Sequence, residues 1–223
     1  DRLSQRRFNH QQCFLLPVPP TDLPFQIWLK GYAVASLPTA QAAQALAQRL
    51  HQQLERGLGD PAQIVPGFER GLPVVRLGQE TLLVIEPALA ESVQFDRELL
   101  AIELANNLRR ALGASALSLA EAQKQMHELE RVPEQLTGFA SWYGPGFHGR
   151  RTANGEIFDE NAMTVAHKTL PFNTYLEIEN QTNGYRAIVR VNDRGPYVED
   201  RVLDLSKQAA RCLGAERRGV IRI

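Results

Sequence analysis

Three acidic side chains lie in short motifs, two of them rich in glycine or proline, toward the C-terminal end of the sequence. Glu156 ends Thr-Ala-Asn-Gly-Glu, Asp193 lies in Asn-Asp-Arg-Gly-Pro, and Asp204 lies in Leu-Asp-Leu-Ser. A carboxylic acid that its surroundings keep protonated can deliver a proton to a leaving oxygen, and the resulting carboxylate can take a proton back. If the three groups lie close together, their negative charges raise the pKa of one of them. The sequence therefore predicts a general acid–base site.

Each aspartate also has a structural alternative. Asp204 could cap the helix expected from Ser206 onward, although Ser206 is itself a good N-cap residue. Asp193 could accept hydrogen bonds from a turn while Arg194 neutralises its charge. Arg194 could equally hold a substrate carboxylate through its planar guanidinium group. The sequence leaves both roles of each residue open.

Glu156 and the histidines have structural alternatives as well. A carboxylate directly after Asn-Gly is typical of an exposed turn, which is the alternative for Glu156. His167 could be a core imidazole with one backbone partner, and His148, in a glycine-rich loop, is expected to face solvent. No Cys-x-x-Cys and no pair of histidines at ligand spacing indicates a metal site.

Short strands are expected on either side of these motifs, because the stretches between the motifs alternate between apolar and polar residues. Asn183-Gly184 is a strong signal for a two-residue hairpin turn, and one brief helix is expected over residues 206–213. The expected strands are residues 138–143, 164–166, 174–180, 185–191, 201–203 and 219–223. Six short strands predict a small β-barrel with the acidic motifs on its loops.

The part of the chain before residue 138 predicts an α+β module and a connector. A helix expected near residues 95–112 is closed by Gly113, and Ser118-Leu-Ala-Glu121 is a capping box that begins a short helix to about Leu129. The other expected elements are a strand or hairpin at 25–35, a helix at 38–56, and strands at 72–78 and 81–86. The predicted parts are a proline-rich arm over 1–24, the α+β module over 25–113, a helical linker over 114–137 and the barrel over 138–223.

Composition restricts the partners of the chain. The 25 basic residues balance the 25 acidic ones, so no net field attracts nucleic acid, and no apolar run is long enough to span a membrane. The segment from Asp1 lacks the pattern of a signal peptide, so the leader of an exported protein is expected to be absent from this chain. Cys13 and Cys212 could form one disulfide or remain two thiols, with Cys212 expected as a small apolar residue on a helix face.

A series of motifs in fixed order resembles the rare lipoprotein A (RlpA) family over roughly the last two fifths of the chain. They are Gly-Arg-Arg-Thr-Ala-Asn-Gly-Glu, Ala-His-Lys-Thr-Leu-Pro and Asn-Asp-Arg-Gly-Pro. The resemblance implies a six-stranded double-psi β-barrel of the kind found in expansins. It also implies a bacterial envelope protein, periplasmic or secreted, that acts as a peptidoglycan lytic transglycosylase on strands stripped of stem peptides. No cofactor is implied, and envelope or divisome proteins are conceivable partners of the N-terminal module.

The resemblance also assigns roles to individual residues. It implies that Asp193 and Asp204 frame the groove, with Asp204 matching the acid of related cellulases, and that Glu156 belongs to the catalytic set. His167 is implied to face the groove, where an imidazole can hydrogen-bond Glu156 or Asp193 and tune its pKa. Psi-type crossings are expected to bring the aspartate loops together.

Four aromatic side chains surround the same loops. Flat rings suit the faces of sugars, which makes Trp142, Tyr143 and Tyr197 candidates for substrate binding beside Arg194. At least two of the set Trp142, Tyr143, Phe147 and Tyr197 are expected in the barrel core.

Several readings of the activity stay open. A hydrolase needs a second carboxylate to activate water or to attack the sugar, whereas a lytic transglycosylase needs one acid that acts twice. With three carboxylates the sequence allows both, and only the resemblance favours the non-hydrolytic route. An expansin-like module that binds or loosens wall glycan without cutting it, and an envelope scaffold, are alternatives. The N-terminal order of elements is similar to that of SPOR peptidoglycan-binding modules, but no sequence motif supports that identification.

Overall fold

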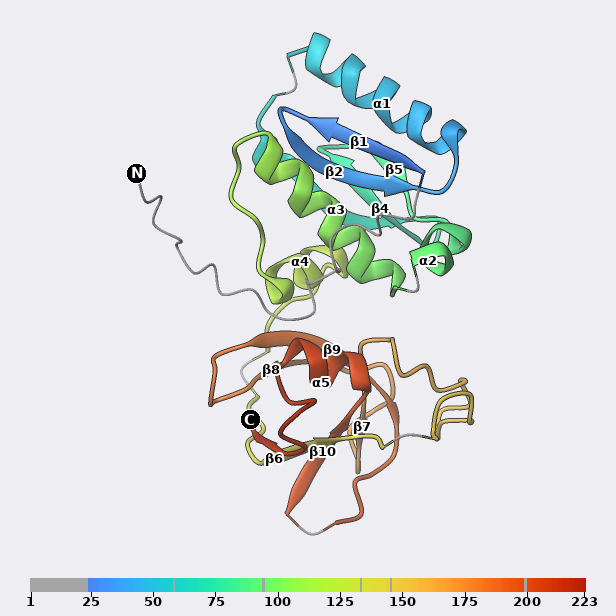
Figure 1. The fold of residues 1–223 in the computed structure, drawn as a ribbon. Helices are drawn as coiled ribbons and strands as arrows, with labels where there is room; N and C mark the ends of the chain where they lie inside the picture. The colour runs from blue at the N-terminus through green and yellow to red at the C-terminus, as the bar shows by residue number, and fades with distance from the viewer. Residues whose placement is uncertain (1–23, 58, 94, 133, 145, 199) are drawn as a thin grey trace, which may run out of the picture. The chain divides into compact units, whose positions relative to one another are not determined.

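The chain is described by a computed structural model over residues 24–223, apart from residues 58, 94, 133, 145 and 199. The described residues form two compact units, one ending at Val132 and the other continuing to Ile223 (Figure 1). Almost all of the predicted arm, and Cys13 with it, lie outside the described residues. Within the described part, no helix combines the length and the apolar character needed to cross a bilayer.

The N-terminal unit is an α+β module, as predicted. Its elements are β1 (Phe25–Leu29), β2 (Tyr32–Leu37), α1 (Ala40–Glu55), the 3₁₀ turn η2 (Pro61–Gln63), β3 (Ile64–Glu69), β4 (Leu72–Leu77), β5 (Glu80–Val84), α2 (Pro87–Val93), α3 (Arg97–Ala111) and α4 (Leu119–Met126). The hairpin β1–β2 and the antiparallel sheet β3–β4–β5 are separate sheets.

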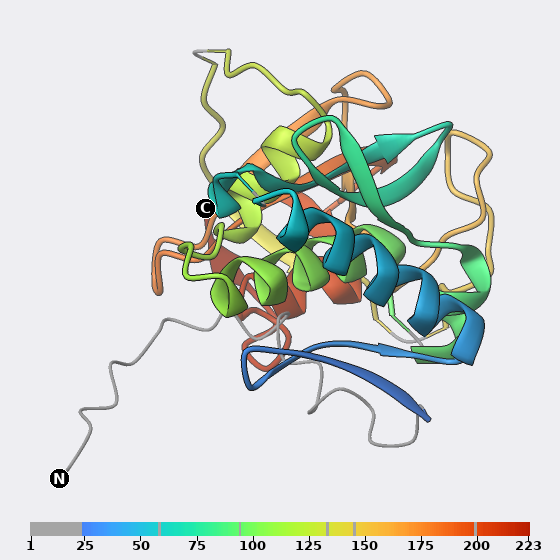
Figure 2. The same ribbon diagram turned by 90° about the horizontal axis from the view of Figure 1, so that it is seen from above.

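Helix α3 is the centre of this unit. It packs against both sheets, on β2 and on β3 and β4, and Figure 2 shows it between the hairpin and the three-stranded sheet. Asp96 caps its N-terminus by accepting hydrogen bonds from the amides of Glu98 and Leu99. Gly113 has a φ of 91° just past its C-terminus, which confirms the predicted cap. Apolar residues on several sides of α3, including Leu99 and Ile102, are fully buried.

Three features of the N-terminal unit differ from expectation. Helix α2 was not predicted. Strand β3 was not predicted, because Pro66-Gly67 in its middle is typical of a turn, yet the strand pairs with β4 in unbroken register. The helix expected within a linker is α4, which does begin with the capping box at Ser118. Its residues Leu119 and Met126 are buried and it packs on β3. Part of the expected linker is therefore core of the N-terminal unit.

The C-terminal unit contains the six strands and one helix that the sequence predicts. They are β6 (Phe139–Trp142), β7 (Thr164–His167), β8 (Tyr175–Glu179), β9 (Arg186–Asp193), β10 (Arg201–Leu205), α5 (Lys207–Cys212) and β11 (Ile221–Arg222). The strand order is β11-β6-β10-β7-β9-β8, with the parallel pairs β6/β10 and β7/β9. The amide of Gln181, just after β8, donates to the carbonyl of Arg222 in β11 at 3.1 Å. This bond links the two edges of the sheet.

Helix α5 and the hairpin β8–β9 settle three further expectations. The Ser206 hydroxyl caps α5 by accepting from the Ala209 amide, so Asp204 is not the cap. Cys212 is buried on α5, which confirms its apolar role. The turn at Asn183-Gly184 is longer than predicted, because residues 180–185 separate the two strands and the Asn180 carbonyl accepts from the amide of Gly184.

One carboxyl group of the N-terminal unit makes its stability depend on pH. Oε2 of Glu103, on α3, is buried without a hydrogen-bond partner, and burial raises the pKa of this carboxyl to about 7. Above that pH the folded unit must hold a buried charge, so stability falls as pH rises from about 4.5 to 7. We expect Glu103→Gln to unfold at higher urea than wild type at pH 8 and at nearly equal urea at pH 5. An equal difference at both pH values would contradict this assignment.

The domain limits lead to a second prediction. The described members of residues 130–137 lie outside helices and strands and are exposed. Arg131 is the basic residue in this segment, so limited trypsin digestion should cut after Arg131 first and leave two stable fragments. Arg131→Gln should remove this cut and leave later cuts unchanged. Early cleavage within β6–β11 or α1–α3, with residues 130–137 intact, would contradict the division.

Candidate active site

Two bulges in the parallel strand pairs bring the two aspartates into one row across the barrel. Asp204 in β10 pairs with Ser141 of β6 on one side and with Ala166 of β7 on the other, and Ala166 in turn pairs with Asp193 of β9. The register shifts at Asn192 in β9, one residue before Asp193, and at Val202 in β10, two residues before Asp204. Bulges re-aim the side chains that follow them and are common next to active sites. Both aspartates thus lie in strands, not on the loops where they were expected.

Asp204 has one anchored and one open carboxyl oxygen. The hydroxyl of Ser141 donates to Oδ1, and Nη1 of Arg201 lies 3.7 Å from the same oxygen. Among the described residues no donor binds Oδ2. The side chain is 19% exposed. The half-buried carboxyl group is therefore held at one oxygen and available at the other.

Asp193 has both carboxyl oxygens engaged. Oδ2 accepts from the Tyr143 hydroxyl at 2.7 Å, and Oδ1 accepts from the amides of Ala153 and Arg194, each at 2.8 Å. Burial raises the pKa of the Tyr143 phenol, and the hydrogen bond to Asp193 and the charges of Asp193 and Asp204 raise it further, so this group stays a neutral donor. Its ring packs on Phe158 at 4.7 Å between centroids. Three donors fix the Asp193 carboxylate in place.

Glu156 is bound to a different set of partners from the one expected. Both of its carboxyl oxygens accept from the Arg190 guanidinium at 2.8 Å, and Asn192 adds a bond of 3.2 Å. The Arg190 hydrogen bonds lower the pKa of Glu156 to about 2, with a further contribution from Asn192. The expected rise of pKa from neighbouring carboxylates is thus not found at this residue. Glu156 is ionised near neutral pH and ties its loop to β9.

His167 also has partners other than the expected ones. Its Nδ1 accepts from the amides of Thr169 and Leu170, at 3.1 and 2.9 Å. Burial, with help from the charges of Arg194 and Lys168, lowers its pKa. The ring is therefore neutral, with its proton on Nε2. No bond of His167 to Glu156 or Asp193 is found among the described residues.

The Arg194 guanidinium does not pair with Asp193 and instead supports its surroundings. It stacks over the Phe172 ring at 3.7 Å from the centroid, and Nη1 donates to the His167 carbonyl at 3.4 Å. A planar cation stacked in this way keeps its outer edge available for hydrogen bonds. Asp193 therefore accepts a hydrogen bond from a turn amide, that of Arg194, but forms no ion pair with the Arg194 guanidinium.

The aromatic side chains lie nearer the surface than expected. Trp142 and Tyr143 are half-buried, Phe147 is exposed, and Tyr197 is 84% exposed. The expectation that at least two of these four belong to the core is wrong, because β6 ends at Trp142 and the next residues leave the barrel. His148 faces solvent as predicted, at 55% side-chain exposure.

Sequence reasoning missed Ser141 and Arg201, which contact Asp204. In a regular strand, residues three apart point to opposite faces, so Arg201 is expected to face away from Asp204. The bulge at Val202 brings both to one face. Gly138 allows this bulge, because a Cβ at that position would lie 2.8 Å from the methyl groups of Val202. No sequence signal reveals the bulge, although Ser141 does lie in a quoted motif.

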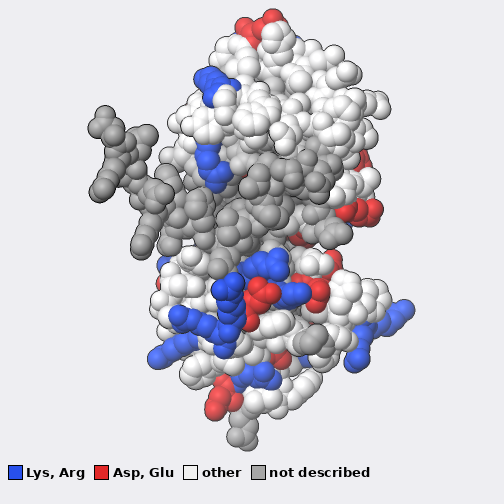
Figure 3. All heavy atoms as spheres, viewed as in Figure 1, with Lys and Arg blue, Asp and Glu red and all other residues white. Residues whose placement is uncertain are grey.

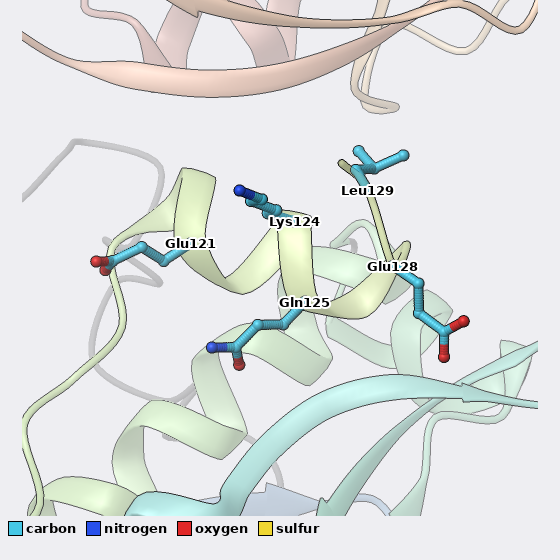
Figure 4. Close-up of a pocket in the computed structure, with 5 residues that line it drawn as sticks. All are labelled: Glu121, Lys124, Gln125, Glu128 and Leu129. Carbon is cyan, nitrogen blue, oxygen red and sulfur yellow. The ribbon is translucent and has the colours of Figure 1, made fainter. Parts of the chain in front are cut away.

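The hollow found on the N-terminal unit contains none of the predicted site residues. This hollow is lined by residues of α4 and the turn after it: Glu121, Lys124, Gln125, Glu128 and Leu129 (Figure 4). Figure 3 shows Lys and Arg gathered over the C-terminal unit with Asp and Glu among them. Within the described part of the chain, no three His, Cys, Asp or Glu side chains are grouped to hold a metal ion.

Comparison with known proteins adds family information to this geometry. The family described as "Lytic transglycolase" matches residues 135–223. A protein of Synechocystis named "Probable endolytic peptidoglycan transglycosylase RlpA" is 42% identical over 193 residues, covering 82% of this chain and 60% of the relative. Proteins named "Endolytic peptidoglycan transglycosylase RlpA" are 60% identical over 79 residues in Campylobacter jejuni and 54% identical over 89 residues in Pseudomonas aeruginosa. These matches cover 35% and 40% of this chain, and 29% and 26% of the relatives.

The C-terminal unit is a double-psi β-barrel of the lytic transglycosylase class, as its two parallel strand pairs and the matched residues show. The chain is similar to a protein named RlpA over 82% of its length, which confirms the predicted resemblance to this family. It spans 60% of the length of the Synechocystis relative and under a third of the other two. The activity of the whole protein is therefore a proposal.

The Glu156–Arg190 pair predicts a specific loss of stability in acid. Because the folded-state pKa lies below the ordinary value of 4.5, the pair stabilises the fold fully above pH 4.5 and less as pH falls toward 2. Glu156→Gln should lower the free energy of unfolding by about 1 kcal/mol at pH 7, a value reduced for solvent screening. In urea titrations the difference from wild type should shrink between pH 4.5 and 2.5. Glu179→Gln, which breaks an exposed pair with Arg186, is the control and should have a smaller effect. A difference that is constant with pH would contradict the pairing.

Proposed function

We propose that the chain is a lytic transglycosylase that cleaves the bond between N-acetylmuramic acid and N-acetylglucosamine in peptidoglycan strands, preferentially peptide-free ones, with Asp204 as its acid and base. The observation that carries this proposal is the asymmetry of the two aspartates. Asp204 keeps one half-buried oxygen without a partner, whereas Asp193 has three donors on its two oxygens. A group that exchanges protons with substrate needs a free oxygen, and a group that stabilises charge needs a fixed one.

The reaction needs a single acid that acts twice. Asp204 in its protonated form gives its proton to the glycosidic oxygen as the bond from the muramic acid C1 breaks. The 6-hydroxyl of the same sugar then attacks C1, and its proton passes to the Asp204 carboxylate. The products are a strand with a free 4-hydroxyl and a strand ending in a 1,6-anhydro sugar. No water is consumed, and Asp204 returns to its starting state.

The neighbouring groups favour this path through charge and hydrogen bonding. Positive charge develops at C1 as the bond breaks, and the fixed Asp193 carboxylate is the negative group available to stabilise it. Neutral His167 offers an Nε2 proton to a glycan oxygen. Exposed Tyr197 and half-buried Trp142 offer rings for stacking on sugars, and Arg194 offers a cation to the lactyl carboxylate.

Glu156 takes a supporting role in this proposal. A carboxyl with a pKa of about 2 carries almost no proton at neutral pH and is a poor general acid. Its bonds to Arg190 and Asn192 instead hold the bulge that precedes Asp193. Glu156 thus contributes to activity by positioning Asp193.

The place of action and the partners follow from the proposed substrate. An enzyme of cell-wall glycan works in the bacterial envelope, so we place it in the periplasm or outside the cell. The N-terminal unit is a candidate for binding envelope or divisome proteins. A barrel that binds glycan without cutting it, like an expansin, is the alternative function.

Digestion of peptide-free sacculi tests the proposal through its products. Purified protein should release glycans with anhydromuramic ends, detected by mass spectrometry. Asp204→Asn and Asp193→Asn should each lower turnover by at least about a hundredfold, the effect of losing a general acid or a charge-stabilising group. Asp159→Asn, at an exposed aspartate of the same unit, is the control and should retain wild-type rates.

Other outcomes would contradict the proposal in distinct ways. Reducing ends in place of anhydro ends would indicate hydrolysis. Retained binding to sacculi with no released product would favour the expansin-like alternative. Wild-type rates in both Asp204→Asn and Asp193→Asn, with the fold intact by circular dichroism, would remove the aspartates from the mechanism.

A further inference from the structure

Ser141 and Arg201 form a directed chain of hydrogen bonds that ends on Asp204. Nη1 of Arg201 donates to the Ser141 hydroxyl oxygen at 2.6 Å, and the Ser141 hydroxyl donates its only proton to Oδ1 of Asp204. An arginine can only donate, so the order from Arg201 through Ser141 to Asp204 is fixed. The chain therefore determines which oxygen of Asp204 is anchored.

The backbone holds all three residues in place. Ser141 and Asp204 are direct partners in the parallel pairing of β6 and β10, and Arg201 reaches the same face through the bulge at Val202. Ser141 is 5% exposed, and the Asp204 carboxyl is half-buried beside it. Rotation of the carboxyl group would break the bond to Ser141, so Oδ2 keeps one direction.

This series of hydrogen bonds also has a cost in folding free energy that packing does not explain. Nε of Arg201 is buried without a hydrogen-bond partner. Burying an unsatisfied donor of a charged group opposes folding. An apolar residue in place of Arg201 would avoid this cost, whereas the arginine supplies the donor that orients Ser141.

We propose that Ser141 and Arg201 are positioning residues, which hold Oδ1 of Asp204 so that Oδ2 meets the glycosidic oxygen. This inference rests on the proposed function and deepens it. Neither residue touches the substrate in this arrangement. Loss of these hydrogen bonds should therefore slow the chemical step and leave glycan binding unchanged.

Kinetics on peptide-free glycan strands test the inference. Ser141→Ala should lower kcat by about ten- to a hundredfold with KM changed less than about twofold, the effect expected when a catalytic group is misplaced. Ser141→Thr keeps the hydroxyl and should recover most of the lost kcat. Arg201→Met, which has no hydrogen-bond donor, should lower kcat in the same manner, while Arg201→Lys, which can still donate to Ser141, should lower it less.

The matched control is Thr164→Val on neighbouring β7. It removes a buried hydroxyl that has no partner, so kcat and KM should match wild type. If Ser141→Ala keeps wild-type kcat, or if Ser141→Thr is as impaired as Ser141→Ala while both melt like wild type, the inference is wrong. Should Ser141→Ala fail to fold, wild-type kcat in folded Arg201→Met would equally overturn it. A wild-type protein that releases no anhydro ends would overturn the proposed function and this inference together.

Discussion

The site depends on two one-residue bulges in the parallel strand pairs of the barrel. Without the extra residue at Val202, Arg201 would face away from Asp204, and without the one at Asn192, Asp193 would not pair with Ala166. Both bulges are held by specific contacts. Gly138 makes room for Val202, and Glu156 binds the Asn192 side chain. The proposed acid–base chemistry thus rests on the backbone geometry of these strand pairs.

The same geometry divides the carboxyl groups by their partners. Asp193 receives donors from Tyr143 and two amides, Asp204 from Ser141, and Glu156 from an arginine and an asparagine. Of these three carboxyl groups, Asp204 alone keeps an oxygen without a donor among the described residues. Different surroundings thus distinguish the proposed acid, Asp204, from two carboxylates that are held in place, and proteins use such differences to give similar groups different tasks.

Much of the barrel could be predicted from the sequence, whereas many of the hydrogen bonds and ion pairs of the site could not. Alternation, turn residues and ordered motifs predicted all six strands and offered Ser206 as one of two candidate caps of α5, because these features depend on local chemistry. Strand β3 was missed because local turn propensity at Pro66-Gly67 is overridden by pairing with β4. The links of Arg201 to Ser141 and of Glu156 to Arg190 join segments distant in sequence through irregular registers, which no local pattern encodes.

Oδ2 of Asp204 is the atom proposed to meet the scissile bond. A crystal structure of the inactive Asp204→Asn variant with a bound peptide-free glycan fragment tests this most directly. We expect the substituted side chain's terminal atom in the place of Oδ2 to lie about 3 Å from a glycosidic oxygen, with Asp193 still bound by Tyr143. A glycosidic oxygen placed against Glu156 or Asp193 instead, or a glycan bound away from this row of strands, would contradict the account.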